Sequence, residues 1–67
     1  MFIDNKYTKT YYQIIERAQS RILDGYTERH HIIPKSIGGP DESFNLVDLT
    51  AREHFLCSLM LLNVMEP

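Results

Sequence analysis

Residues 28–39, ERHHIIPKSIGG, decide the fold of this chain, because two adjacent histidines stand there in front of a proline and two glycines. Neighbouring residues of a strand point to opposite faces of a sheet, so one packing role cannot explain both His30 and His31. Pro34 ends the strand, and the glycines, prolines and small polar residues that follow are typical of a loop. The pattern therefore predicts a strand that brings two histidines into two different environments.

The residues after this loop predict a second strand and a helix. NLVDL, at residues 45–49, reads as a short strand, so the two strands form a hairpin with a long, irregular connection. Thr50 and Glu53 then match a capping box, in which two side chains satisfy backbone amides at a helix start. The segment AREHFLCSLMLLNV follows as the predicted helix, and it carries His54 in its first turn.

The residues before the first strand predict another helix, at about residues 10–24. Thr10 and Gln13 match a capping box, and Gly25 suits the position after a helix end. The apolar residues recur at the helical period and lie on one face; they are Tyr11, Ile14, Ile15, Ala18, Ile22 and, at the edge, Leu23. The whole chain, residues 1–67, is therefore expected to be a single α+β domain in the order helix, strand, loop, strand, helix.

Length and composition restrict the class of protein. A domain of 67 residues buries only about 60% of the surface that its unfolded chain exposes, so a metal or a partner is expected to add stability. Cys57 is the only cysteine, which excludes an internal disulfide and suggests a buried thiol in a reducing compartment. No secretory signal or membrane-length apolar run is visible, so we expect a cytoplasmic protein. The net charge of −2 argues against a stand-alone, high-affinity nucleic-acid binder.

All three histidines belong to the hairpin and the helix that follows it. Such a set can support metal-assisted hydrolysis of a phosphodiester, in which one strand histidine holds the metal and its neighbour takes a proton from water. The Asn45 side chain has a carbonyl oxygen that can fix the ring of the base histidine. The alternative is that His30 and His31 are a half-buried pair on an exposed strand and that His54 only caps a helix.

Residues 28–57, ERHHIIPKSIGGPDESFNLVDLTAREHFLC, resemble the HNH endonuclease family in its ββα-metal form. More narrowly, they resemble small bacteriophage HNH and homing-endonuclease-like proteins. The doubled histidine, I-x-P-x-S-x-G-G, N-L-V-x-L-T and A-R-E-H carry the resemblance, which covers about half of the chain. It implies a ββα-metal module at about residues 26–64 behind an added N-terminal helix, a divalent metal ion (Mg²⁺, Mn²⁺, Ni²⁺ or Zn²⁺) as cofactor, and DNA as substrate.

The resemblance also implies a role for individual residues. His31 corresponds to the general base that activates water, and Asn45 to the residue that orients it. His30 and His54 correspond to metal ligands. Glu28 matches an acidic residue that lies near the metal or near a ligand histidine in some members.

The resemblance also implies phosphate contacts, and the sequence departs from the family pattern in two respects. Arg29, Lys35 and Arg52 correspond to phosphate contacts. Ser58 stands where many members carry a further histidine one helical turn after the first, and a hydroxyl is a poor metal ligand beside an imidazole. Homing-type members continue into DNA-binding modules that these residues lack, so we do not expect sequence-specific cleavage by them alone.

A function from another class stays open. The last helix is apolar on more than one face, whereas a surface helix of a small domain usually has a single apolar stripe. Its apolar residues are Phe55, Leu56, Leu59, Met60, Leu61, Leu62, Val64 and Met65. One alternative is a degenerate HNH-derived phage protein that does not cleave DNA and instead binds and inhibits or modulates another protein, such as a host defence protein or an enzyme. Another is a subunit that cleaves only as a homodimer joined through this helix.

Overall fold

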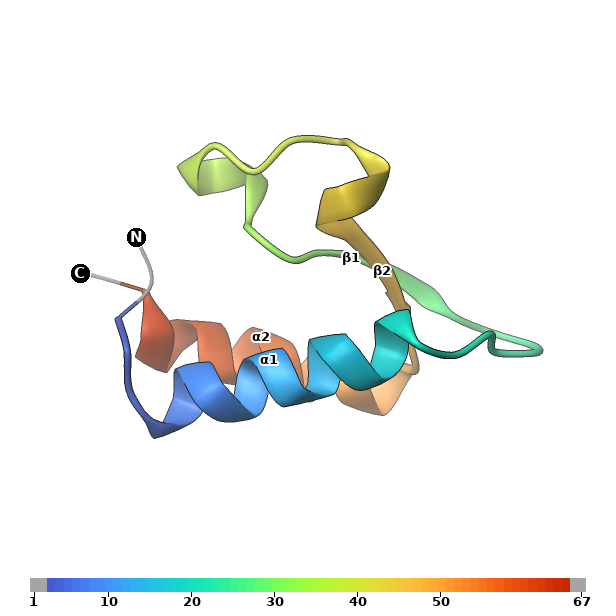
Figure 1. The fold of residues 1–67 in the computed structure, drawn as a ribbon, viewed down its shortest axis with the longest axis horizontal. Helices are drawn as coiled ribbons and strands as arrows, with labels where there is room; N and C mark the ends of the chain where they lie inside the picture. The colour runs from blue at the N-terminus through green and yellow to red at the C-terminus, as the bar shows by residue number, and fades with distance from the viewer. Residues whose placement is uncertain (1–2, 66–67) are drawn as a thin grey trace.

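The computed structural model describes residues 3–65 and confirms an α+β fold of two helices and a two-stranded antiparallel hairpin (Figure 1). The order β1, β2, α2 is compatible with the predicted ββα module, and α1 precedes it. The elements are α1 (Lys6–Gln19), β1 (Glu28–His31), the 3₁₀ turns η1 (Lys35–Ile37) and η2 (Ser43–Asn45), β2 (Leu46–Leu49) and α2 (Ala51–Val64).

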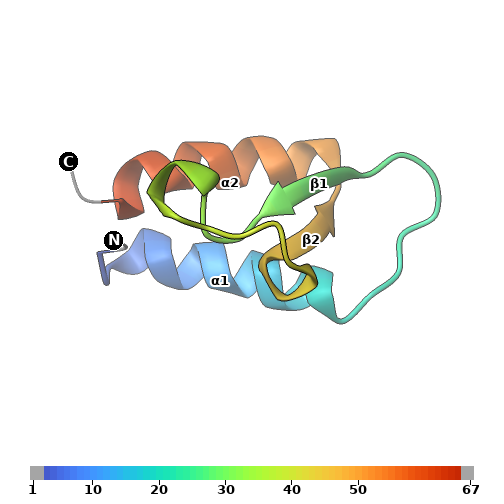
Figure 2. The same cartoon turned by 90° about the horizontal axis from the view of Figure 1, so that it is seen from above.

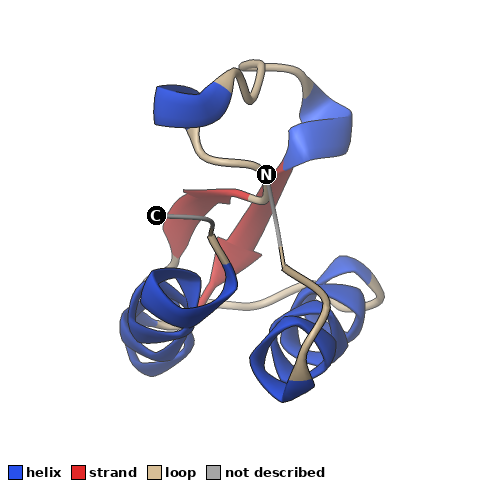
Figure 3. Ribbon diagram, turned by 90° about the vertical axis from the view of Figure 1, so that its left-hand side faces the viewer, coloured by secondary structure: helices blue, strands red, loops and turns tan. Residues whose placement is uncertain are grey.

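The two helices lie side by side and run in opposite directions (Figure 2). The hairpin covers one side of the helix pair, and the loop that carries η1 and η2 lies farther out (Figure 3). At one end of the pair, the Ile3 amide donates to the Val64 carbonyl, and the Asn5 side chain donates to the Asn63 carbonyl at 2.9 Å. The segment before α1 is therefore tied to the end of α2.

Helix α1 begins earlier than the sequence predicted. Asn5 is its N-cap, and its side-chain oxygen accepts hydrogen bonds from the amides of Tyr7 and Thr8. Thr10, the predicted cap, lies inside the helix, where its hydroxyl donates to the Lys6 carbonyl at 3.0 Å. Asparagine is among the strongest N-cap residues, so the earlier cap takes precedence.

Helix α1 also ends earlier than predicted, at Gln19 rather than near residue 24. Ile22, which the periodic pattern placed on the apolar face, is 96% exposed. Gly25 adopts a φ of 84° within the connecting loop and does not close the helix. The buried face of α1 therefore stops at Ala18, and the following residues cross to the hairpin.

Helix α2 begins and ends where the sequence predicted, with both hydrogen bonds of the capping box present. Glu53 of this box also accepts from the Arg21 guanidinium, which fastens the start of α2 to the segment after α1. The Arg21 hydrogen bond is the main reason that the pKa of Glu53 falls to about 2. Neither helix of the described chain is both long and apolar enough to cross a membrane.

The core lies between the helix pair and the inner face of the hairpin. Cys57 is fully buried, as predicted, and burial raises the pKa of its thiol to about 11. The remaining buried members of the cluster are Tyr11, Ile14, Ile15, Ala18, Ile32, Val47 and Leu49. Tyr11 is therefore the one core residue with a polar end that α1 contributes.

The register of the hairpin gives the two strand histidines opposite surroundings. His30 pairs with Val47 and is 5% exposed, whereas His31 pairs with Leu46 and its side chain is 28% exposed. Arg29, on the same face as His31, forms an ion pair with Asp48 across the hairpin at 3.5 Å. The structure thus confirms that the adjacent histidines point to opposite faces.

The two glycines of the loop have distinct steric roles. Gly38 closes η1 with a φ of 95°, in the left-handed region that favours glycine. Gly39 packs so closely on the preceding chain that a Cβ atom there would lie 1.7 Å from the Ile33 carbonyl oxygen. The loop therefore folds back on the end of β1, beside His31.

Candidate functional site

One cleft gathers all three histidines at the edge of β1. Its walls come from β1, from the start of the loop and from α2. The lining residues are Arg29, His30, His31, Pro34, Lys35, His54, Ser58 and Leu61. Three other predicted site residues, Glu28, Asn45 and Arg52, do not line the cleft.

His30 lies at the buried side of the cleft, against α1. Its Nε2 atom is 2.6 Å from the Tyr11 hydroxyl oxygen, and that hydroxyl donates to the Ile32 carbonyl at 2.7 Å. Burial, followed by the nearby His54 and His31, lowers the pKa of His30 to about 4. Burial likewise raises the pKa of Tyr11. His30 is therefore a neutral imidazole near pH 7, the form that binds metal ions.

His54 faces His30 from the first turn of α2, with ring centroids 5.2 Å apart. Its Nδ1 atom is 2.6 Å from Oε1 of Glu28, while Tyr26 donates to Oε2 of the same carboxylate at 2.5 Å. The Tyr26 and His54 hydrogen bonds lower the pKa of Glu28. An ionised carboxylate only accepts hydrogen bonds, so His54 donates from Nδ1, and in the neutral form of the ring the lone pair is on Nε2.

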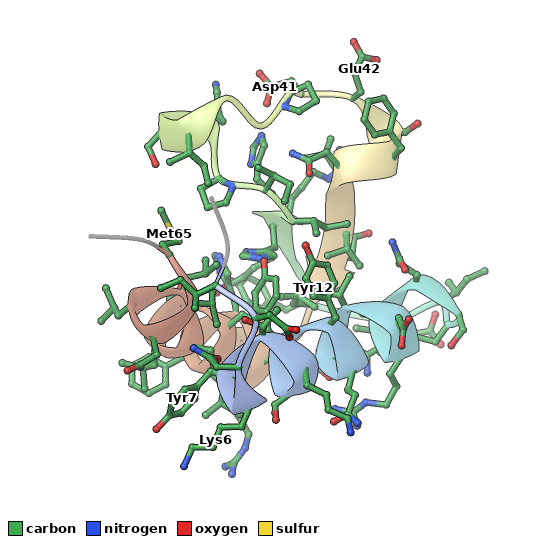
Figure 4. All side chains as sticks on the ribbon, turned by 60° about the vertical axis from the view of Figure 1, so that its left-hand side comes forward. Lys6, Tyr7, Tyr12, Asp41, Glu42 and Met65 are labelled. Carbon is green, nitrogen blue, oxygen red and sulfur yellow. The ribbon has the colours of Figure 1, made fainter. Side chains whose placement is uncertain are left out.

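His31 lies on the outer side of β1, and the loop holds it. Its Nε2 atom is 2.5 Å from Oδ1 of Asp41, and Lys35 contacts Oδ2 of the same residue at 3.2 Å. The His31 hydrogen bond and then Lys35 lower the pKa of Asp41. Figure 4 shows Asp41 on the outer part of the loop, away from the helices. Because Nε2–H donates to the carboxylate, the lone pair of neutral His31 lies on Nδ1.

The Asn45 side chain hydrogen-bonds backbone groups of the loop, and among the described residues it forms no hydrogen bond with the predicted partner, the His31 ring. Its Oδ1 accepts from the Ile33 amide at 2.8 Å, and its Nδ2 donates to the carbonyls of Ile33 and Pro40, each at 3.0 Å. Buried backbone groups need partners, and this amide supplies three at the neck of the loop. Asn45 therefore braces the loop that carries Asp41, and its support of His31 is indirect.

The remaining predicted residues differ in their relation to the cleft. Ser58 lines it, but its hydroxyl donates to the His54 carbonyl at 2.9 Å. Arg29 and Lys35 place largely exposed side chains at its rim, each next to a carboxylate. Arg52 is exposed at the start of α2, outside the lining.

His30 and His54 can offer two imidazole donors to a metal ion. Among residues 3–65, no group of three or more His, Cys, Asp or Glu side chains can hold a metal ion. Glu28 is engaged with His54 and Tyr26, so it acts on His54 and does not stand as a third donor. The protein part of a metal site here would thus consist of two ligands.

Sequence reasoning did not find three residues of this site. Tyr11 was assigned to the apolar face of a helix, which is where it lies, but no local pattern connects it with His30. Asp41 and Tyr26 come from irregular segments whose conformations periodicity does not predict. A carboxylate in a loop after a histidine strand is the single signal that could have drawn attention to Asp41.

Comparison with curated proteins reveals relatives from a bacteriophage. Over 63 residues the chain is 51% identical to probable mobile endonuclease D of enterobacteria phage T4, and over 56 residues it is 54% identical to probable mobile endonuclease E of the same phage. It is also 44% identical over 41 residues to an uncharacterized 38.5 kDa protein in psbA intron 1 of Chlamydomonas moewusii.

These matches span most of the chain but only part of each relative. They cover 87%, 82% and 61% of the chain, and 24%, 40% and 12% of the three relatives. No family model matches the chain, and no solved structure matches it. The chain is thus similar to a portion of phage proteins that are named mobile endonucleases.

Proposed function

We propose that the chain is an HNH-type, metal-dependent endonuclease module that hydrolyses phosphodiester bonds of DNA in the cytoplasm of a bacterial host. The observation that supports this most is the cleft that joins three histidines from β1 and α2 with two cations at its rim. The names of the phage relatives support DNA as the substrate. The doubled histidine and its neighbours support the HNH type.

The donor set of His30 and His54 fits a divalent ion. The rings of His30 and His54 have centroids 5.2 Å apart, so the two imidazoles would be close enough to hold one divalent ion between them. Two protein ligands leave positions for water and for a substrate phosphate, as catalytic sites require. His30 and His54 would hold the ion, and a bound ion would supply charge stabilisation at the scissile phosphate and the leaving oxygen.

His31 acts as the general base in this proposal. Its Nδ1 atom takes a proton from the attacking water, while Asp41 on Nε2 holds the ring and stabilises the imidazolium that forms. Asn45 fixes the loop on which Asp41 stands. Arg29 and Lys35 bind the phosphate backbone by exchanging their carboxylate partners for phosphate oxygens.

Nicking of supercoiled plasmid by the purified chain tests the proposal. Magnesium, manganese, nickel and zinc are each supplied after removal of metal with a chelator, and His31→Ala serves as the matched variant. We expect nicks that require metal and that the variant does not make. A folded wild-type protein that leaves plasmid intact with every metal would overturn the endonuclease function.

One observation favours a second function, which is binding to another protein. Phe55, Leu59 and Leu62 are 64%, 45% and 80% exposed, and their spacing puts them on one face of α2. Substitution of all three by serine would then abolish binding to a protein partner, or self-association in sedimentation, while His31→Ala would leave it intact. Under the endonuclease proposal alone, the triple variant nicks plasmid as the wild type does.

A further inference from the structure

Tyr11 reaches the site from α1, outside the hairpin and α2 that carry the histidines. Its side chain is fully buried, and its ring stands edge-on to His30 with centroids 5.8 Å apart. We infer that Tyr11 is a positioning residue that fixes the tautomer of His30 and so makes Nδ1 the metal-binding atom of that histidine. This inference rests on the proposed metal site, and it adds a helix that the histidine motif does not include.

The two hydrogen bonds of the Tyr11 hydroxyl determine the tautomer of His30. The Tyr11 oxygen lies 2.6 Å from His30 Nε2 and 2.7 Å from the Ile32 carbonyl oxygen. The carbonyl cannot donate, and the hydroxyl has a single hydrogen, which therefore goes to the carbonyl. The contact with His30 is then a hydrogen bond only if His30 Nε2 carries a hydrogen and donates it. In a neutral imidazole, the lone pair is consequently on Nδ1.

The opposite tautomer would break this arrangement. With hydrogen on Nδ1, both the His30 Nε2 lone pair and the Ile32 carbonyl would require the same hydroxyl hydrogen, and one of them would stay unpaired. Buried polar groups without partners are costly, and Tyr11 cannot turn away because its ring belongs to the core. The choice of coordinating nitrogen is therefore made by packing before any metal arrives.

The two ligand histidines thus use different nitrogens and different anchors. His54 donates from Nδ1 to Glu28 and keeps Nε2, whereas His30 donates from Nε2 to Tyr11 and keeps Nδ1. Anchors of this kind orient a ligand ring, and their removal typically weakens metal binding about 10–100-fold. Helix α1 is in this sense a part of the metal site.

Nitrogen NMR of the metal-free protein and zinc titration test the inference together. In ¹⁵N-labelled wild-type protein, we expect His30 to show hydrogen on Nε2 and lone-pair character on Nδ1. Tyr11→Phe keeps the ring but removes the hydroxyl, and we expect a mixture of His30 tautomers and zinc affinity about 10–100-fold weaker. Tyr7→Phe makes the same chemical change at an exposed position of α1, and should alter neither readout.

The outcomes separate this inference from the proposed function. Hydrogen on Nδ1 of His30 in the wild type, or an unchanged tautomer and zinc affinity in Tyr11→Phe, would overturn the role of Tyr11. Failure of the folded wild type to bind zinc would overturn the metal site, and the coordination by Nδ1 with it, while the metal-free spectrum still decides the tautomer. The amide spectrum of Tyr11→Phe shows whether the variant is folded at the temperature of titration.

Discussion

The inner and outer sides of β1 hold two histidines, one residue apart, in contrasting ways. On the inner side, the core encloses His30, and a fully buried tyrosine anchors it. On the outer side, a loop carboxylate that is 63% exposed holds His31. A buried hydrogen bond whose loss orphans a group costs about 1–3 kcal/mol, whereas an exposed ion pair contributes about 0–1 kcal/mol. The inner histidine is therefore held more strongly, and the outer one is more accessible to solvent.

This difference suits two chemical tasks. A metal ligand benefits from a fixed ring and a fixed nitrogen, because ordering has then been completed during folding. A general base needs access to water and freedom to accept a proton, which the partly exposed ring of His31 has. The alternation of a strand supplies both environments from adjacent positions, which explains why a short chain places two histidines side by side.

The largest expected effect is the loss of activity when His31, on the outer side of β1, is replaced. His31→Ala removes the proposed base, and we expect plasmid nicking to fall by about 10²–10⁴-fold. The free energy of unfolding should change by less than about 1 kcal/mol, because the lost ion pair is exposed. Nicking rates and urea denaturation of the same samples measure the two quantities. Loss of stability together with activity would show that the outer histidine is structural.

The second effect is the loss of stability when His30, on the inner side of β1, is replaced. His30→Ala leaves a cavity beside the core and removes the donor to the Tyr11 oxygen, so we expect a loss of about 2–4 kcal/mol in the free energy of unfolding. Urea denaturation in a chelator excludes any contribution from metal. His31→Ala under the same conditions is the matched control. Equal stability of the two variants would contradict the contrast between the sides.

A third effect, confined to acidic pH, tests the same contrast in the metal-free protein. The pKa of His30 is about 4 in the fold against 6.5 for an ordinary histidine. Between these values the unfolded chain binds a proton that the folded one does not, so the free energy of unfolding falls as the pH falls from about 6.5 to about 4. We expect His30→Gln to lose this slope and His31→Gln to keep it. Identical slopes would count against the burial of His30.

Local patterns predicted the secondary structure well where a single interaction decides it. The capping box of Thr50 and Glu53 and the helix after it agree with the structure, since both partners lie within four residues. The predicted start of α1 is wrong because Thr10 matches a capping box, whereas Asn5, a more strongly favoured cap, lies five residues earlier and begins the helix. The end was wrong because Ile22 continues the apolar period yet meets no packing surface.

The histidines of the site could be recognised from the sequence, but their anchors could not. Alternation predicted that His30 and His31 face apart, and the structure confirms it. The anchors Tyr11 and Asp41 depend on how α1 and the loop pack against β1, which no local period encodes. The sequence suggests that Asn45 orients the ring of His31, because an amide can hydrogen-bond an imidazole. In the structure the Asn45 side chain instead hydrogen-bonds three backbone groups of the loop.

The smallest effect is expected when Asp41, which holds the His31 ring, is replaced. Asp41→Asn keeps the shape of the side chain but removes a charge that both His31 and Lys35 contact. Loss of the anchor should lower kcat about two- to fivefold, as befits an exposed pair. The same change frees Lys35 for a phosphate, so KM for DNA should fall at low salt. Steady-state nicking of a short labelled duplex measures kcat and KM separately.

The combined change in kcat and KM distinguishes the possible roles of Asp41. If the only role of Asp41 were to repel DNA, Asp41→Asn would lower KM and leave kcat constant. The carboxylate would then not be required for His31 to act as a base. If it only braced the loop, kcat and the free energy of unfolding would fall together, with KM unchanged. Lys35→Gln is the matched control, because it removes the other partner of Asp41 and should raise KM while leaving kcat near the wild-type value. A lower kcat with a lower KM in Asp41→Asn is therefore expected only when one carboxylate holds the base and restrains the cation.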